Sequence, residues 1–592
     1  MSKKSTINES DSTPSTARMI LGEVASPGVA RGTAVVCGCA KNTSIARHVI
    51  DEGEVSNEIE RFDAAIAKAE KEMLRLRQHI GRNHGENEAA IFDAHIALLH
   101  DSSLRDTVKA LCTTSKLNVE AALSEAIDTL AAAFARLNNP YFRERAADLR
   151  DVGNRLMEAL TKDEQHESLC FPDGTVLVAG ELMPSVIAQL DEKAIRAVVV
   201  EQGGQTAHST ILARARGIPL LIHVPDATAT IRNGDQLIVD GLAGRIFINP
   251  KSEIQREYNQ LEADLNAHKS ALKDLIDLSA VTRDAVAIKL CANIGKVADA
   301  VAAVKVNADG VGLYRTEFVF LAQDHFPPEE EQYQLYRATA EHMGRREVVI
   351  RVLDIGSDKL LSYFPLAWEA NPSLGVRGTR LLLAHPEILQ AQLRAILRLS
   401  ATHRVAILFP MVGGIEDLTA AKAAIERAKV SLASEDKPFN PNIRVGAMIE
   451  TPAAVIMVAR LAQEVDFMSV GTNDLVQYLL TTDRTSSEVA NYYEPLHPAV
   501  LHSLHQVASA AAAQNTEASL CGEMAGNPAF TELLLGLGFR SLSVNPGEVL
   551  EIKNAIRATD MQKATKFVQQ LLKLSTAQEI KDCIHERTHM GK

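Results

Sequence analysis

The chain has 592 residues. At about 150 residues per domain, this length predicts roughly four domains, or two to three if one is a large α/β barrel. Hydrophobic residues make up 46% and charged residues 23%, a balance that excludes disordered, collagen-like and disulfide-scaffold proteins. No apolar run approaches the roughly 18 residues needed to cross a bilayer. The net charge of -13 argues against a nucleic-acid binder, whose surface is basic.

The seven cysteines are scattered and contain no C-x-x-C pair, so the sequence predicts neither a disulfide framework nor a zinc cluster. Unpaired cysteines are typical of a reducing compartment, and we expect the protein to be cytoplasmic. Residues 1–18 are rich in Ser and Thr and lack the hydrophobic stretch of a secretory signal, so we interpret them as a flexible tail.

Two kinds of sequence alternate in the first half of the chain. Short apolar runs bounded by Gly and Pro indicate strands in residues 19–51 and again in 163–250. Between them, residues 52–162 repeat apolar side chains at helical spacing and are poor in Gly and Pro, which predicts about four helices. We therefore expect one small α/β domain interrupted by an all-helical insertion.

Residues 251–280 contain no Gly or Pro and predict a linker helix. Residues 281–592 then alternate strand and helix signals, and eight strands separated by helices fit a (β/α)8 barrel of the TIM type. The alternative is an open doubly wound sheet, which the absence of a G-x-G-x-x-G after the first strand disfavours. The predicted strands are Val286–Ile294, Gly312–Thr316, Val348–Ile355, Val405–Val412, Arg444–Glu450, Phe467–Asn473, Ala518–Gly522 and Ser541–Val544.

Polar clusters follow several of these strands, at the end where the active site of such a barrel lies. Glu450 and Asp474 end neighbouring predicted strands, and two carboxylates suit Mg²⁺, which keeps waters and accepts phosphate oxygens. Arginines at this end would bind a substrate with carboxylate and phosphate groups. Cys521 could act there as an acid or a nucleophile. For any single residue, a surface salt bridge is the alternative. The other polar residues near the strand ends are Arg315, Glu317, Arg351, Asp354, Arg377, Asn473 and Arg484.

A second candidate site is the loop Gly203–Thr210, which reads G-G-Q-T-A-H-S-T and lies between a predicted strand and a helix. Its two glycines favour a tight turn, and His208 would lie near the first helical turn, where free backbone N–H groups favour an anion. This environment suits a phosphorylated imidazole. A helix-capping loop with an incidental histidine is the alternative.

The sequence closely resembles the Enzyme I family of the bacterial phosphotransferase system, the phosphoenolpyruvate–protein phosphotransferases. The resemblance runs from about residue 20 to the C-terminus and includes the order of the domains. It is carried by the strings G-G-Q-T-A-H-S-T, G-V-G-L-Y-R-T-E-F, M-I-E-T-P-A-A, G-T-N-D-L-V-Q-Y and C-G-E-M-A-G.

The resemblance implies a reaction and its residues. His208 would take the phosphoryl group from phosphoenolpyruvate (PEP), Glu450 and Asp474 would bind Mg²⁺, and Cys521 would protonate the enolpyruvate carbon as pyruvate forms. The helical block 52–162 would dock the histidine-containing phosphocarrier protein HPr, and the barrel would carry a homodimer contact. The implied substrate-binding residues are Arg315, Arg351, Arg377, Asn473, Asp474 and Arg484.

Within the helical block, Ala90–Ile96 and Glu144–Asp148 match the expected docking region. His95 is either a direct contact to the partner or an ordinary histidine on a helix face. Because the histidine loop and the barrel mouth belong to different predicted domains, the mechanism requires domain motion, and we expect the hinge in the linker helix.

The sequence departs from the family pattern at Gln205, Ile187, Ser357 and Val376, where relatives usually have Arg, Thr, Gly and Trp. The Thr replaced by Ile187 can hydrogen-bond the active histidine in relatives, so the orientation of His208 is open. Three alternatives to a sugar-branch Enzyme I remain. They are the nitrogen-regulatory paralogue, a nucleotide-dependent PEP or pyruvate enzyme, and a non-catalytic regulator that binds partners.

Overall fold

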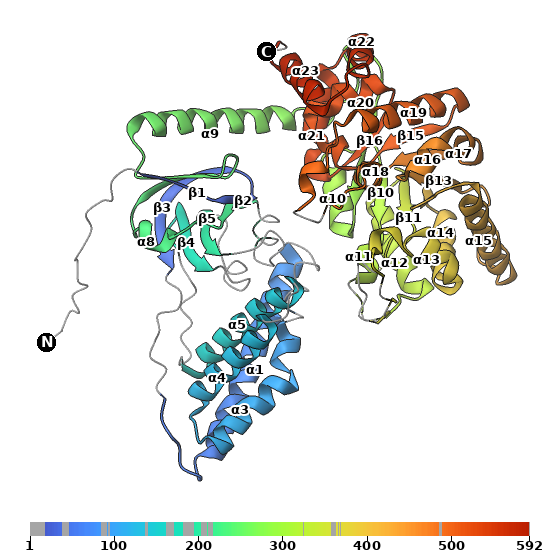
Figure 1. The fold of residues 1–592 in the computed structure, drawn as a ribbon. Coiled ribbons are helices and arrows are strands. Elements are labelled where there is room, and N and C mark those ends of the chain that lie inside the picture. Colours follow the sequence, from blue (N-terminus) through green and yellow to red (C-terminus); the bar gives the residue numbers. More distant parts are fainter. Residues whose placement is uncertain are drawn as a thin grey trace. The chain divides into compact units, whose positions relative to one another are not determined.

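The computed structural model describes residues 18–37, 47–83, 92, 95–135, 140–161, 171–181, 194–202, 210, 213, 217–321, 323, 325–356, 363–364, 366–367, 369–484 and 488–590. The chain divides into two compact units, Met1–Asn266 and Ala267–Lys592 (Figure 1). Among the described residues, no helix is both long and apolar enough to cross a membrane.

The first unit contains an eight-stranded mixed sheet with the strand order β1-β8-β7-β3-β4-β5-β6-β2. Strands β3 to β6 pair in parallel, and β1, β2, β7 and β8 pair in antiparallel fashion. The strands are β1 (Arg18–Leu21), β2 (Glu23–Ser26), β3 (Val29–Cys37), β4 (Thr175–Glu181), β5 (Ile195–Gln202), β6 (Leu220–Ile222), β7 (Gln236–Asp240) and β8 (Arg245–Ile248), with the short helix α8 (Ala227–Thr230) between β6 and β7.

The sheet has a buried layer on each face. On β4, Val176 and Val178 belong to one apolar cluster, and Leu177 and Ala179 belong to the other. Successive side chains of a strand point to opposite faces, so a strand buried on both sides is apolar throughout. This explains why the sequence shows a continuous apolar run here.

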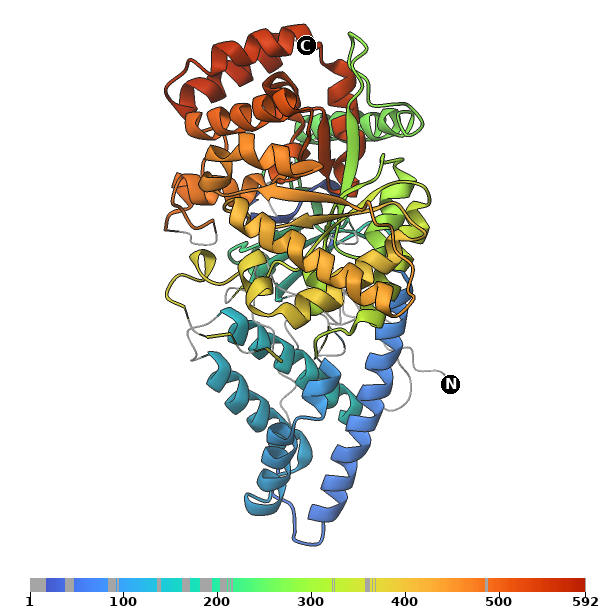
Figure 2. The ribbon, with the colours of Figure 1, turned by 90° about the vertical axis from the view of Figure 1, so that its right-hand side faces the viewer.

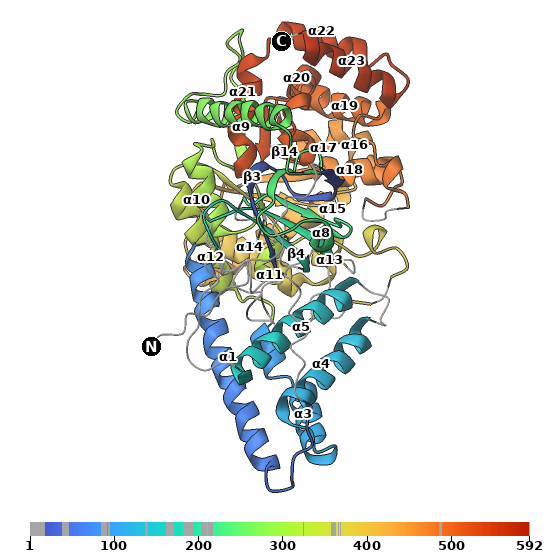
Figure 3. The ribbon, with the colours of Figure 1, turned by 90° about the vertical axis from the view of Figure 1, so that its left-hand side faces the viewer.

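Four long helices form a bundle between β3 and β4 in the chain, and their packing is visible in Figure 3. Phe62, Met73, Leu104, Leu123 and Leu156 are among the fully buried residues of their common core. The predicted helical character of this block is confirmed. The helices are α1 (Val55–Asn83), α3 (Ser102–Thr114), α4 (Val119–Ala135) and α5 (Pro140–Thr161).

Helix α9 (Ser252–Lys273) continues from the first unit into the second, and the division between the units falls inside it. In its first half, the Tyr258 hydroxyl donates a hydrogen bond of 2.6 Å to Asp240 Oδ2. At its far end, His268 Nε2 lies 2.9 Å from Glu551 Oε1 in the second unit. Lys553 Nζ donates to the backbone carbonyl of Ile276 just beyond the helix, at 3.0 Å. Each end is thus fixed to its own unit by side-chain contacts.

The second unit is a closed parallel barrel of eight strands. Figure 2 shows helices of this unit, coloured yellow to red, around the strands. The predicted (β/α)8 architecture is therefore confirmed. Its strands are β9 (Lys289–Ile294), β10 (Val311–Arg315), β11 (Val348–Arg351), β12 (Val405–Phe409), β13 (Arg444–Ile449), β14 (Phe467–Val470), β15 (Glu517–Leu520) and β16 (Ser541–Val544).

The helices of the second unit lie between the strands in the chain and after the last one. They are α10 (Val297–Lys305), α11 (Glu317–Leu321), α12 (Glu329–Met343), α13 (Thr379–Ala384), α14 (Pro386–Ser400), α15 (Ile415–Ser434), α16 (Pro452–Ile456), α17 (Val458–Glu464), α18 (Thr472–Leu479), α19 (Pro498–Gln514), α20 (Thr531–Leu537), α21 (Val549–Ala558), α22 (Met561–Leu571) and α23 (Ala577–Met590).

Several barrel strands end earlier than the sequence predicts, because side chains replace the strand ladder near the mouth. Strand β11 was expected to reach residue 355 and ends at Arg351. Beyond it, the Leu353 N–H donates to Gln392 Oε1 at 2.9 Å, and the Asp354 N–H donates to Glu317 Oε1 at 3.1 Å. These side-chain acceptors satisfy the backbone without a neighbouring strand.

Candidate active site

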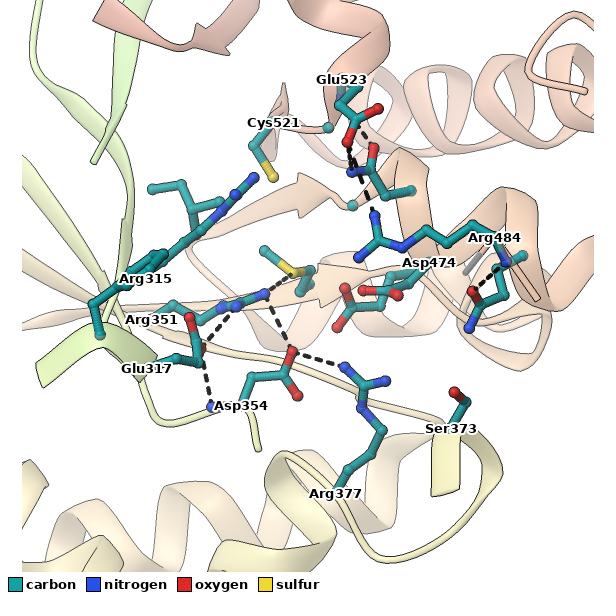
Figure 4. A pocket seen from close by; sticks show the side chains of 18 of the residues that line it. Arg315, Glu317, Arg351, Asp354, Ser373, Arg377, Asp474, Arg484, Cys521 and Glu523 are labelled. Carbon is teal, nitrogen blue, oxygen red and sulfur yellow. Dashed lines mark hydrogen bonds and ion pairs between the residues drawn. The ribbon is translucent and has the colours of Figure 1, made fainter. Parts of the chain in front are cut away.

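A cleft of about 670 Å³ lies at the carboxyl ends of the barrel strands. The structure brings together all eight barrel residues that the sequence singles out as ligands or acid. Figure 4 shows the labelled guanidinium groups directed toward one cavity from different segments of the barrel. The eight residues are Arg315, Arg351, Arg377, Glu450, Asn473, Asp474, Arg484 and Cys521.

Two of the arginines are buried and held by carboxylates. Arg351 Nη2 donates to Glu317 Oε1 at 2.8 Å, and Arg351 Nη1 lies 3.4 Å from Asp354 Oδ2. The same Asp354 oxygen accepts from Arg377 Nη2 at 3.2 Å. Burial lowers the pKa of Arg351, but Glu317 and Asp354 outweigh this effect, and the pKa is raised overall. Carboxylates therefore orient both guanidinium groups beside the cleft.

Glu317 and Asp354 line the same cleft, and the sequence does not reveal what they do there. Their positions near strand ends were evident, but a carboxylate there could equally bind a metal or a substrate. Only the pairing with Arg351 and Arg377 identifies them as positioning residues. Both carboxylates are buried, with 4% and 1% of their surfaces exposed.

Glu450 is held by a strained backbone segment. Strand β12 stops at Phe409, and Met411, two residues later, has a left-handed φ of 54°. In this conformation the Met411 N–H donates to Glu450 Oε1 at 2.6 Å. The other oxygen, Oε2, is buried and has no hydrogen-bond partner. An orphaned buried carboxylate oxygen that faces a cleft is an available ligand for a cation.

The electrostatics of Glu450 support the same interpretation. Burial, followed by the nearby carboxylates of Asp474 and Asp354, raises the pKa of Glu450 to about 8, although Arg351 acts in the opposite direction. Asp474 lies in the first turn of α18 and lines the same cleft. Two carboxylates that repel each other are the arrangement that a bound cation relieves.

The Glu450 and Asp474 carboxylates suit Mg²⁺ better than a metal ion whose ligands all come from the protein. The described residues contain no group of three or more His, Cys, Asp and Glu side chains arranged to hold a metal ion. Mg²⁺ commonly uses one or two carboxylates and completes its shell with water and substrate phosphates. Glu450 and Asp474 provide this number of protein ligands.

Cys521 follows β15 and is buried, with 2% of its surface exposed. Its Sγ accepts a hydrogen bond of 3.1 Å from Ser469 Oγ. Asn293 Nδ2 donates to the Cys521 carbonyl at 2.9 Å and fixes the backbone. Burial raises the pKa of the thiol. Cys521 is therefore protonated at neutral pH, as an acid must be before it acts.

The rim of the cleft is more exposed. Asn473 and Glu523 exchange two hydrogen bonds, from Asn473 Nδ2 to Glu523 Oε1 at 2.8 Å and from the Glu523 N–H to Asn473 Oδ1 at 2.9 Å. Arg484 Nη1 lies 4.0 Å from Glu523 Oε1 (Figure 4). Glu523 thus orients both substrate-binding candidates from the rim.

Of the histidine loop Gly203–Thr210, only Thr210 belongs to the described residues. His208 lies outside the described residues, as do three of the positions that depart from the family pattern, Gln205, Ile187 and Ser357. The fourth, Val376, is 44% exposed next to buried Arg377.

The helical block resolves one open alternative. His95 is fully buried, its Nε2 lies 3.2 Å from Asp148 Oδ1, and its Nδ1 lies 3.7 Å from Asp151 Oδ2. A direct contact between His95 and a partner protein is therefore wrong for this structure. The rest of Ala90–Ile96, apart from Phe92 and Ile96, and the side chains of residues 144–147 lie outside the described part.

Comparison with known proteins agrees with this geometry. Three family models match the chain: "PEP-utilising enzyme, N-terminal" at residues 22–145, "PEP-utilising enzyme, mobile domain" at 171–244, and "PEP-utilising enzyme, PEP-binding domain" at 269–561. The last of these covers every barrel residue named above.

Curated relatives named phosphoenolpyruvate-protein phosphotransferase match over nearly the whole chain, and three of them illustrate the similarity. The protein of Haemophilus influenzae is 38% identical over 568 residues, 96% of this chain and 99% of its own length. That of a Bacillus species is 37% identical over 563 residues, 95% and 97% of the two chains. That of Buchnera aphidicola from Acyrthosiphon pisum is 37% identical over 562 residues, 95% and 98%. With this identity over this length, the chain belongs to the phosphoenolpyruvate-protein phosphotransferase family of PEP-utilising enzymes.

Proposed function

We propose that this protein transfers the phosphoryl group of PEP to its own His208 and then to HPr, releasing pyruvate, as the first step of phosphotransferase-driven sugar uptake. One observation carries the proposal. Four arginines, two converging carboxylates and a protonated thiol line a single cleft at the barrel mouth. PEP is a small molecule with a carboxylate, a phosphate and a carbon that must be protonated, and this cleft has a group for each.

The arginines bind the two anionic groups of PEP. A guanidinium forks onto carboxylate or phosphate oxygens, and charge neutralisation is the main contribution a protein makes to phosphoryl transfer. Arg351 and Arg377 are already oriented by Glu317 and Asp354, so little ordering is required when PEP enters. Arg315, Arg484 and Asn473 complete the substrate contacts from the rest of the cleft.

Glu450 and Asp474 hold Mg²⁺, which supplies positive charge to the phosphate oxygens. A ring nitrogen of His208 attacks phosphorus, the bond from phosphorus to the enol oxygen breaks, and its electron pair stays on the enolate. The Cys521 thiol then gives its proton to the methylene carbon, which yields pyruvate and a thiolate.

The domain roles follow the same proposal. Residues 19–51 and 163–250 form the phosphohistidine domain, 52–162 the HPr-binding domain, 251–280 the linker helix, and 281–592 the PEP-binding and dimerisation domain. The "mobile domain" family model spans His208, which supports its role as the residue that moves between sites. A homodimer formed through the barrel and a cytoplasmic location belong to the same proposal.

The decisive experiment uses PEP labelled on phosphate, with Mg²⁺ and without nucleotide. We expect acid-labile label on the peptide that contains His208, and its discharge when HPr is added. His208→Ala should abolish labelling while the barrel still binds PEP in a calorimetric titration. A requirement for ATP would contradict the proposal and favour a nucleotide-dependent PEP or pyruvate enzyme. Label that HPr fails to discharge, but a nitrogen-branch phosphocarrier accepts, would identify the regulatory paralogue.

A further inference from the structure

A polar track runs through the barrel interior from its floor to Cys521. Glu517, Ser519 and Cys521 alternate along β15 and the residue after it, so their side chains share one face of the strand. On the neighbouring strand β14, Ser469 pairs with Ser519 in the sheet register. The barrel also holds the buried polar side chains of Asn293 and Ser543, and an apolar inner cluster that contains Leu313, Val349, Ala406, Leu408, Met448 and Phe467.

The two serines connect to the thiol by hydrogen bonds that run in one direction. Ser519 Oγ donates to Ser469 Oγ at 3.1 Å, and Ser469 Oγ donates to Cys521 Sγ at 3.1 Å. Ser519 Oγ also lies 3.3 Å from the Met468 carbonyl, a second acceptor toward which its hydroxyl can turn. The oxygen and sulfur atoms are thus spaced so that each hydroxyl can donate toward the sulfur.

The lower end of the chain reaches a small cavity at the barrel floor. This cavity, of about 20 Å³, is lined by Ser519 together with charged residues. Its volume is sufficient for one water molecule. Lys289 and Arg444 bridge to Glu517 at 2.8 Å each, and the three side chains are 37%, 35% and 34% exposed. The floor is thus open to solvent, whereas only 2% of the Cys521 surface is exposed.

From this arrangement we propose that Ser519 and Ser469 form a proton relay that returns a proton to Cys521 from the barrel floor while the mouth is occupied by ligand. The proposal rests on the acid role of Cys521 in the proposed function. After Cys521 has protonated the enolate, its thiolate takes the Ser469 proton. Ser469 takes the proton of Ser519, and Ser519 takes one from water in the floor cavity, which is left as hydroxide until solvent at the open floor reprotonates it. The net change is one proton drawn from solvent, and both hydroxyl groups then rotate back.

The relay is physically useful because bound ligand blocks the other route. PEP or pyruvate in the cleft separates Cys521 from water at the mouth, so a thiolate formed in the closed site would otherwise wait for product release. A chain of hydroxyl groups passes a proton without leaving a charge in the apolar interior. Ser519 does not touch the substrate. It acts through Ser469 and Cys521, by holding the proton that they pass on.

The test measures deuterium entering pyruvate in D₂O with the full protein and Mg²⁺. If Cys521 takes methyl protons back to re-form the enolate and the relay exchanges them with solvent during one residence of pyruvate, doubly and triply deuterated methyl groups appear at the earliest times. Ser519→Ala should lose these species and give singly deuterated pyruvate first, whereas Ser519→Thr, which keeps a hydroxyl, should restore them. Ser541→Ala is the matched control, since Ser541 pairs with Ser519 on β16, lines the same cavity and takes no part in the chain of hydrogen bonds.

An unchanged deuterium pattern in Ser519→Ala, an equal loss in Ser541→Ala, or only single deuteration with the wild-type protein would each overturn the relay. Cys521→Ala separates this failure from that of the proposed function. We expect it to abolish exchange, with Cys291→Ala, another buried thiol, as its control. Persistent exchange in Cys521→Ala would remove the acid role of Cys521 and the relay with it.

Discussion

At the barrel mouth, Glu317, Arg351, Asp354 and Arg377 form a buried network of ion pairs. A buried charge is stable only when it is paired, so the carboxylates are as necessary as the arginines. Both guanidinium groups line the cleft, where PEP would add negative charge.

Glu317→Gln should destabilise the barrel because Arg351 then keeps its charge without its nearest partner. We expect the free energy of unfolding to fall by about 3 kcal/mol, the usual cost of breaking a buried pair. PEP brings negative charge to the same guanidinium, so it should raise the unfolding midpoint more in the variant than in the wild type. Thermal unfolding with and without PEP measures both effects.

Glu341→Gln is the control for this variant. Glu341 pairs with Arg337 at 2.7 Å on the surface of α12, and its side chain is 51% exposed. An exposed pair contributes little, and the expected change is within about 0.5 kcal/mol. Equal losses in the two variants would mean that the mouth network has no special role in stability.

At the scale of elements, the junctions between strands and helices determine the space around Glu450 and Asp474, the candidate metal ligands. Gly471 lies between β14 and α18, and a Cβ added there would lie 2.6 Å from Glu450 Oε2. That oxygen is the unpartnered one, so the absence of a side chain at residue 471 keeps the space beside it open.

Gly471→Ala should therefore displace the Glu450 carboxylate and weaken Mg²⁺ binding. We expect the Mg²⁺ concentration for half-maximal labelling of the protein by PEP to rise by about tenfold or more, the size of effect seen when groups that orient metal ligands are changed. Gly547→Ala is the control, because an added Cβ there meets nothing within 4 Å. An unchanged Mg²⁺ requirement in Gly471→Ala would argue against Glu450 as a ligand.

The barrel strands show which features of an element the sequence predicts and which it does not. All eight barrel strands were predicted, because buried parallel strands read as apolar runs. Their ends were predicted less well. Strand β12 stops at Phe409 because Pro410 has no N–H for the ladder and Met411 turns to the left-handed region. Neither the conformation of Met411 nor its hydrogen bond to Glu450 can be derived from residue order.

At the scale of the whole molecule, α9 crosses the division between the two units, and each of its ends is fixed to its own unit. Arg31 Nε donates to Glu262 Oε2 at 2.7 Å on one side, and His268 contacts Glu551 on the other. The helix between these two residues contains the division between the two units. This is where we expect the hinge required by the proposed transfer from the barrel mouth to HPr.

Barrel stability should depend on pH through Glu450. Its folded pKa is about 8 against an ordinary value of 4.5, so between these values the folded state holds a proton that the unfolded state has lost. The stabilising contribution is complete below 4.5 and disappears as the pH rises through about 8, at up to about 1.4 kcal/mol per pH unit.

Stabilisation of the barrel by Mg²⁺ should instead increase with pH, because Mg²⁺ binds the ionised Glu450 carboxylate and displaces this proton. We expect the rise in unfolding midpoint caused by Mg²⁺ to grow as the pH increases toward 8, and Glu450→Gln to remove this dependence. Calorimetric scans across this pH range, with and without Mg²⁺, test the prediction. A Mg²⁺ effect that is independent of pH would contradict the raised pKa.

The sequence by itself determined the alternation of eight strands with helices, the family, and the residue types at the strand ends. These are local properties, because apolar periodicity and short motifs can be recognised without knowing which residues meet in the fold. The tertiary structure decided which charges meet. Glu317, Arg377 and the segment that holds both Arg351 and Asp354 are apart in the chain, and only the packing of the strands and helices brings their side chains within hydrogen-bond distance. The same packing buries Glu450 and aligns Ser519 with Ser469, because burial and register depend on residues far apart in the chain.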